Sequence, residues 1–130
     1  MIALDTNLLA RLLLRDDAAQ HARVKSLLQT KQVFTAPVTV LLELVWVLEA
    51  NDCTPAEVAH GLRLLLGLPN FRPPQADAVR TALRAYVQGA DFADALHLAL
   101  SSGDDAFMTF DKGFVRKAAK LELGPRVVQA

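Results

Sequence analysis

The sequence has only one cysteine, Cys53, in 130 residues. A single cysteine cannot close an intramolecular disulfide, and the histidines are scattered, so no Cys/His cluster has zinc-binding spacing. Nothing in the chain therefore requires an oxidising compartment. An apolar strand is expected from the first residues onward, which leaves no room for a cleaved signal peptide. We expect a cytoplasmic protein.

An excess of basic residues is also missing, because 14 lysines and arginines balance 14 aspartates and glutamates. A strongly positive charge is typical of nucleic-acid-binding domains, so a polyanionic ligand would need a local basic patch and metal here. Long hydrophobic runs are absent too. The longest apolar stretch, residues 38–48, is interrupted by Glu43 and is too short to span a bilayer, so we expect no membrane association.

Two common catalytic motifs are absent as well. The chain has neither a Gly-x-Ser-x-Gly nucleophile elbow nor a glycine-rich loop that ends in Gly-Lys-Ser/Thr. Hydrolysis by a metal-activated water needs neither of them, because the metal supplies the nucleophile and neutralises the developing charge.

Hydrophobic spacing and turn residues predict short strands that alternate with helices. Thr54-Pro55-Ala56-Glu57, for example, is a capping box with proline at the first helical position. The expected strands are residues 1–4, 33–36, 106–110 and 126–129, and the expected helices are residues 7–15, 16–31, 37–51, 55–67, 75–88, 91–101 and 112–121. This alternation, without repeats or linkers, predicts one α/β domain over residues 1–130 with a mostly parallel sheet.

What the sequence does contain is a set of carboxylates beside apolar runs: Asp5, Glu43, the pair Asp91 and Asp94, and Asp111. Grouped carboxylates repel one another unless a cation lies between them, and no basic residue neighbours the first three groups. Asp5 and Asp111 follow predicted strands, at the edge where α/β sheets bind ligands. Asp91 and Asp94 share one helix face. Carboxylates are ligands that Mg²⁺ and Mn²⁺ prefer, so the pattern predicts a metal site.

Four segments together resemble the PIN-domain family, and are most similar to the VapC-like toxins of type II toxin–antitoxin pairs. They are Leu4-Asp5-Thr6-Asn7, Leu42-Glu43, Asp91-Phe92-Ala93-Asp94-Ala95-Leu96 and Thr109-Phe110-Asp111. The resemblance covers nearly the whole chain and implies a single PIN-like domain, an α/β/α sandwich with a short-stranded central sheet. It also implies an Mg²⁺- or Mn²⁺-dependent endoribonuclease. Such a toxin hydrolyses RNA phosphodiester bonds, is silenced by a small cognate antitoxin and forms a homodimer.

The resemblance assigns roles to the acidic residues. Asp5, Glu43, Asp94 and Asp111 fall on the family's catalytic quartet. Asp5 and Asp94 are expected to bind the metal directly. Glu43 and Asp111 are expected to bind it directly or through water, or to position the attacking water, and Asp111 is included among the metal ligands. Asp91 either caps its helix or extends the site toward a second metal.

Substrate contacts are expected from polar and basic side chains beside these acids. Thr6, Asn7 and Thr109 resemble the polar residues that line PIN-domain pockets. Basic residues follow Asp5 and Asp111 at helical spacing, and they would guide RNA phosphates unless they form ordinary solvated helix faces. They are Arg11 and Arg15 on the first helix, and Lys112, Arg116, Lys117 and Lys120 near the end of the chain; Arg11, Lys112 and Arg116 are the selected candidates.

Several alternatives stay open. His97 is expected to be a partly buried histidine rather than a metal ligand, and the leucine-rich residues 59–68 form either core or a self-association surface. The chain could instead be a catalytically weak PIN-like module that binds RNA or protein. A metal-dependent phosphatase of the haloacid dehalogenase kind is less favoured, because Asn7 stands where that family has a second aspartate.

Overall fold

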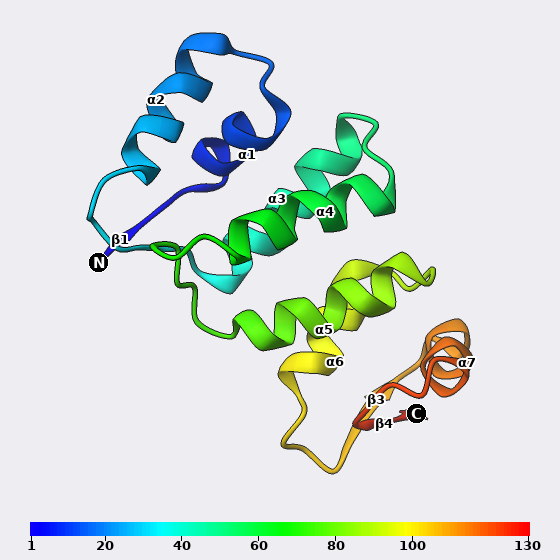
Figure 1. Ribbon diagram of the computed structural model, residues 1–130. Helices are drawn as coiled ribbons and strands as arrows, with labels where there is room; N and C mark the ends of the chain where they lie inside the picture. The colour runs from blue at the N-terminus through cyan, green and yellow to red at the C-terminus, as the bar shows by residue number, and fades with distance from the viewer. The chain divides into compact units, whose positions relative to one another are not determined.

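The computed structural model describes residues 1–130, which fold into two compact units, Met1–Ala76 and Asp77–Ala130 (Figure 1). The short strands are separated along the chain by runs of one to four helices. In order, the elements are β1 (Ile2–Ala3), α1 (Thr6–Leu14), α2 (Ala18–Leu28), β2 (Phe34–Thr35), α3 (Val38–Ala50), α4 (Pro55–Leu66), α5 (Ala76–Val87), α6 (Phe92–Leu100), β3 (Ala106–Thr109), α7 (Lys112–Lys120) and β4 (Arg126–Gln129).

The predicted α/β class with parallel strands is confirmed. β1 pairs with β2 in parallel, with Ile2 opposite Phe34, and β3 pairs with β4 in parallel, with Ala106 opposite Arg126. Each unit therefore contains one two-stranded parallel ladder. The single-domain organisation over residues 1–130 stays a prediction.

The first unit is built around α1, which packs against both α2 and α3, while α3 also contacts α4 (Figure 1). Helix α3 is apolar on most sides, and Leu41, Leu44 and Val45 are almost fully buried. The expected capping box begins α4: the Thr54 hydroxyl accepts the Glu57 N–H, and the Glu57 carboxylate accepts the Thr54 N–H. Both contacts satisfy backbone donors that a helix start otherwise leaves unpaired.

The second unit has its own core, in which Leu98 of α6 packs with Phe114 and Ala118 of α7. Phe107 of β3 stacks edge-on against Phe114, with ring centroids 5.8 Å apart. Because α7 also contacts β3 and β4, this core fixes α6 and α7 on one scaffold. The starts of these two helices, caps included, carry three of the predicted acidic residues.

Several smaller expectations can be compared with the structure. None of the helices is long and apolar enough to cross a membrane.

In the leucine-rich residues 59–68, Leu62, Leu65 and Leu66 are buried, whereas Leu64 is 57% exposed. Most leucines of that stretch therefore belong to the core, and the homodimer stays a prediction. His97 is exposed rather than partly buried, because its side chain lies on the solvent side of α6.

Candidate functional site

Three of the predicted acids gather in the second unit. Asp91, Asp94 and Asp111 line one pocket of about 290 Å³, together with Gly89 and Lys117. Asp91 and Asp94 come from the start of α6, and Asp111 from the start of α7. The sequence motifs Asp-Phe-Ala-Asp and Thr-Phe-Asp are thus brought to one place by the packing of these two helices.

Local hydrogen bonds fix two of these carboxylates. Asp91 is the N-cap of α6, and its Oδ2 accepts the Asp94 N–H at 3.0 Å. Asp111 is the N-cap of α7, and its Oδ1 accepts the Phe114 N–H at 3.0 Å. The Thr109 hydroxyl accepts the Asp111 N–H at 3.1 Å. Each cap engages one carboxylate oxygen, so the other stays available to a ligand. The capping role considered for Asp91 is therefore present.

Electrostatics single out Asp94. Burial raises the pKa of this carboxyl above its usual range, and the negative charges of Asp91 and Asp111 raise it further, while His97 acts weakly in the opposite direction. Partial burial beside like charges disfavours the ionised form, which is the situation that a bound cation would relieve. Among the predicted acids, Asp94 thus lies where a positive ligand would gain most.

In the first unit, Thr6 links the other two predicted acids. Asp5 is the N-cap of α1, and its Oδ1 accepts the Thr6 N–H at 2.7 Å. The buried Thr6 hydroxyl donates to Glu43 Oε1 on α3 over a long 3.5 Å. Asp5 and Glu43 are themselves exposed. The packing of α1 on α3 therefore brings Asp5 and Glu43 close to one threonine.

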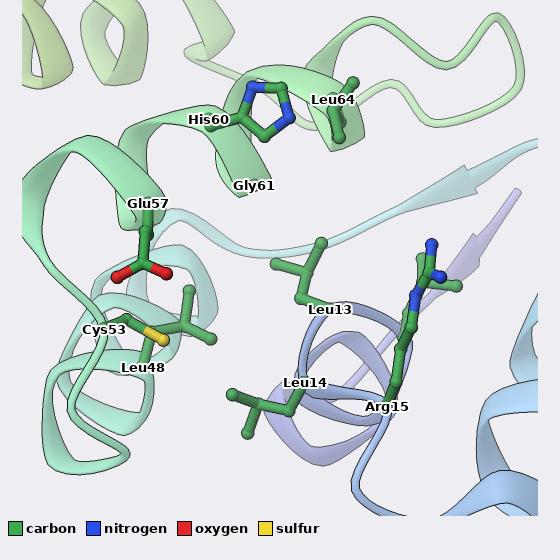
Figure 2. Close-up of a pocket in the computed structure, with 10 residues that line it drawn as sticks. Leu13, Leu14, Arg15, Leu48, Cys53, Glu57, His60, Gly61 and Leu64 are labelled. Carbon is green, nitrogen blue, oxygen red and sulfur yellow. The ribbon is translucent and has the colours of Figure 1, made fainter.

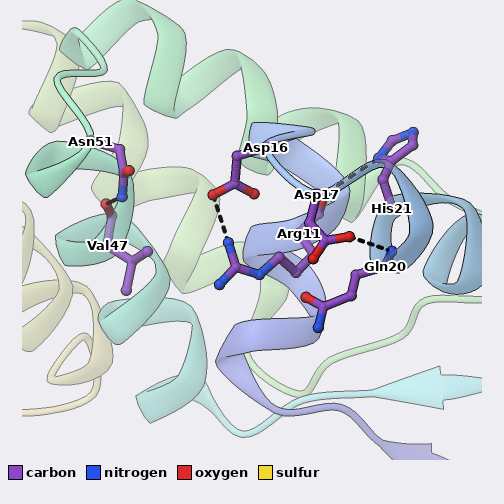
Figure 3. Close-up of polar contacts among 7 residues, drawn as sticks. All are labelled: Arg11, Asp16, Asp17, Gln20, His21, Val47 and Asn51. Carbon is purple, nitrogen blue, oxygen red and sulfur yellow. Dashed lines mark hydrogen bonds and ion pairs between the residues drawn. The ribbon is translucent and has the colours of Figure 1, made fainter.

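The predicted basic residues are placed less uniformly. Arg11 Nη1 lies 2.6 Å from Asp16 Oδ2, an ion pair that Figure 3 shows at the end of α1. This contact holds the pKa of the Asp16 carboxyl below its usual value. A role for Arg11 in RNA binding would therefore compete with an existing partner. Lys112 and Arg116 are exposed on α7 and do not line the acidic pocket. Asn7 is exposed on α1.

A comparison with protein families matches the PIN domain over residues 2–120. The chain belongs to the PIN-domain family. Membership indicates nuclease activity in general, with RNA as the kind of molecule bound, and nucleases of this family generally use divalent metal ions. No individual curated protein matches the chain.

The acids of this PIN domain suit a hard divalent cation by their chemistry. All of them offer carboxylate oxygens, which Mg²⁺ and Mn²⁺ prefer over nitrogen or sulfur. Neither unit by itself brings three His, Cys, Asp or Glu side chains close enough to hold one ion. Asp5 and Glu43 belong to the first unit, whereas Asp91, Asp94 and Asp111 belong to the second.

The first unit of the PIN domain contains a further pocket, of about 350 Å³, which the sequence did not indicate (Figure 2). Leucines, most of them from α1, form much of its lining, and Cys53, Glu57 and His60 line it as well. Burial raises the pKa of the Cys53 thiol, and the charges of Glu57 and Asp52 add to the shift. The thiol is thus held protonated, so Cys53 is not an activated nucleophile.

Lys117 lines the acidic pocket but is not among the RNA contacts predicted from the sequence. It is one of four basic residues on the helix after Asp111, of which only Lys112 and Arg116 are predicted RNA contacts. A detectable signal existed: Lys117 stands three residues after the buried Phe114 and one before the buried Ala118, so it flanks the core-facing stripe. Lys112 and Arg116 lie farther toward solvent.

Proposed function

We propose that the protein is an Mg²⁺- or Mn²⁺-dependent endoribonuclease that hydrolyses phosphodiester bonds of RNA. The observation that supports this most directly is the acidic pocket of Asp91, Asp94 and Asp111 inside a PIN domain. The raised pKa of Asp94 supports a cation there, because a bound positive ion would offset the burial and the neighbouring negative charges that disfavour the ionised carboxylate.

In this proposal Asp5, Glu43, Asp94 and Asp111 form the catalytic set. Asp5, Asp94 and Asp111 would hold the metal, and Glu43 would orient the attacking water. When bound, the metal would supply an activated water and would neutralise charge that develops on the phosphate. Two contacts support the roles of protein residues: the Thr6 hydroxyl donates a long hydrogen bond to the Glu43 carboxylate, and the Thr109 hydroxyl accepts the Asp111 backbone N–H.

Capping also supports the proposed roles of Asp5 and Asp111. A carboxylate bound to the start of its own helix is held in one rotamer, so little side-chain entropy is lost when a ligand binds. Thr6, Asn7 and Thr109 would contact the substrate beside these acids, and Arg11, Lys112 and Arg116 would contact its phosphates.

The biological role we propose is that of the toxin in a toxin–antitoxin pair, acting in the cytoplasm as a homodimer and silenced by a small antitoxin. The resemblance of the four acidic segments to VapC-like toxins supports this role. Induced expression should arrest bacterial growth, and expression of Asp94→Asn should not. Normal growth at matched protein levels of the unaltered chain would contradict a toxin role and leave the nuclease activity to be tested separately.

Cleavage of single-stranded RNA by the purified chain tests the enzymatic proposal. Activity should require Mg²⁺ or Mn²⁺ and should fall by at least about a thousandfold in Asp5→Asn and in Asp94→Asn. Asp104→Asn is a matched control, because Asp104 is an exposed aspartate of the second unit that does not line the acidic pocket. Cleavage by the two site variants at the rate of the Asp104→Asn control would show that the nuclease assignment is wrong.

A further inference from the structure

Helix α7 carries four basic residues, but the structure separates one of them from the rest. Lys117 is partly buried and lines the acidic pocket, whereas Lys112, Arg116 and Lys120 are exposed and do not. Sequence spacing alone places all four on the same short helix. The packing of Phe114 and Ala118 into the core decides which of them faces the pocket.

The ammonium group of Lys117 has no carboxylate partner. Ion pairs join Arg11 to Asp16 and Arg80 to Asp77, whereas Lys117 forms none. The charges that act on Asp94 are those of Asp91, Asp111 and His97. Lys117 therefore shares a pocket with three acids without lying within 4 Å of any carboxylate oxygen, and its donors are available to another group.

Gly89 forms the wall next to this ammonium. Its φ of +105° is a conformation that side-chain-bearing residues rarely adopt, and a Cβ there would lie 3.4 Å from Lys117 Nζ. The absence of a side chain thus keeps the space around the ammonium open. The pocket has carboxylates from the starts of α6 and α7, and a lysine from farther along α7.

We propose that Lys117 is a substrate-positioning residue that binds a non-bridging phosphate oxygen of the RNA backbone at the acidic pocket. The inference rests on the proposed nuclease function and adds a residue to it. Three carboxylates repel a phosphodiester, so a phosphate in this pocket requires positive charge from the protein as well as from metal. An ammonium group is a compact point charge with three donors, which suits one phosphate oxygen and carries no base specificity.

The test measures binding of labelled oligouridine in the presence of Mg²⁺, by fluorescence anisotropy over a series of salt concentrations. All proteins carry Glu43→Gln, which is intended to prevent cleavage by removing the proposed water-orienting carboxylate while it leaves the proposed metal ligands in place. Lys117→Gln should weaken binding by about tenfold at low salt. It should also reduce the slope of log affinity against log salt by about 0.7, the value for one lost contact to a single strand.

Two further variants separate a phosphate contact from a structural effect. Lys117→Arg keeps the charge and should restore most of the affinity and the slope. Lys120→Gln removes an exposed charge from the same helix and should leave both nearly unchanged. Equal affinity and equal slope for Lys117→Gln and Lys120→Gln would overturn the inference.

Failure of this inference is distinguishable from failure of the proposed function. RNA cleavage by the chain with Glu43 intact, together with normal binding by Lys117→Gln, would keep the nuclease and remove Lys117 from the site. Absence of both cleavage and oligouridine binding in the parent chain would overturn the nuclease proposal and this inference with it.

Discussion

Replacement of Asp94 by asparagine should stabilise the metal-free protein. The carboxylate is partly buried beside Asp91 and Asp111, and burial followed by these two charges raises its pKa. Asparagine has the same shape without the charge. Charge interactions at partly exposed positions are worth about 0.2–1 kcal/mol each, so the free energy of unfolding should rise by roughly 0.5–1 kcal/mol. For a domain of this size, Tm should rise by about 2–5 °C.

The order of stability of Asp94→Asn and the parent chain should reverse when metal is present. A ligand at one hundred times its Kd stabilises a folded protein by about 2.7 kcal/mol. If Asp94 holds the ion, the unaltered chain gains this amount in Mn²⁺ and the variant gains much less. Thermal unfolding in a chelator and in Mn²⁺ should therefore rank the two proteins in opposite orders.

The stability difference between Asp94→Asn and the parent chain should depend on pH in one direction only. A carboxyl whose pKa is raised in the folded state keeps its proton to higher pH than the unfolded chain does, so its stability contribution declines as pH rises through the two pKa values. The advantage of Asp94→Asn in chelator should thus be present at neutral pH and vanish at about pH 3, where aspartates are protonated. Asp104→Asn is the control. A metal-free Asp94→Asn protein that is less stable than the parent, or that gains equally from Mn²⁺, would refute the reasoning.

Two further predictions concern catalytic coupling and helix capping. If Asp5 and Asp94 serve one metal centre, the double asparagine variant should cleave RNA no more than about threefold more slowly than the slower single variant, whereas independent roles would give multiplied losses in the same assay. Thr54→Ala should cost about 1 kcal/mol in urea unfolding, because it removes the cap of α4. The contacts with Thr54 lower the pKa of Glu57, so the stability that the Glu57 charge provides should be lost as pH falls through that lowered value, and Glu57→Gln should converge with the parent in acid.

Secondary structure was predictable where a local signal determines it. Thr54 and Glu57 specify the start of α4 by contacts within four residues, and Pro55 suits its first turn. The expected helix ends differ from the observed ones by a few residues, most at α2, which ends at Leu28 rather than near residue 31. Frayed helix ends depend on weak local preferences, so such boundaries are the least determined part of a sequence-based prediction.

The candidate site was predictable only in part, because it depends on contacts between elements. The acidic residues of the site could be predicted because the charge of a carboxylate beside an apolar run must be offset by another group. The distinction between Lys117 and Arg116 could not be made the same way, because adjacent residues on α7 differ in direction by about a quarter turn. Which of them faces the pocket depends on how Phe114 packs against Leu98, and that contact joins residues 16 positions apart in the sequence.

The capping contacts determine which substitutions can separate a structural from a chemical role for these acids. Asp91 and Asp111 each give one carboxylate oxygen to the first turn of a helix. Alanine at either position would remove a cap worth about 1 kcal/mol together with the charge, so a loss of activity could come from a frayed helix. Asparagine keeps an acceptor oxygen of the same reach and caps almost as well, and it removes only the charge. A substitution of Asp94 does not remove a helix cap, because its carboxylate caps no helix and only its backbone N–H donates to Asp91.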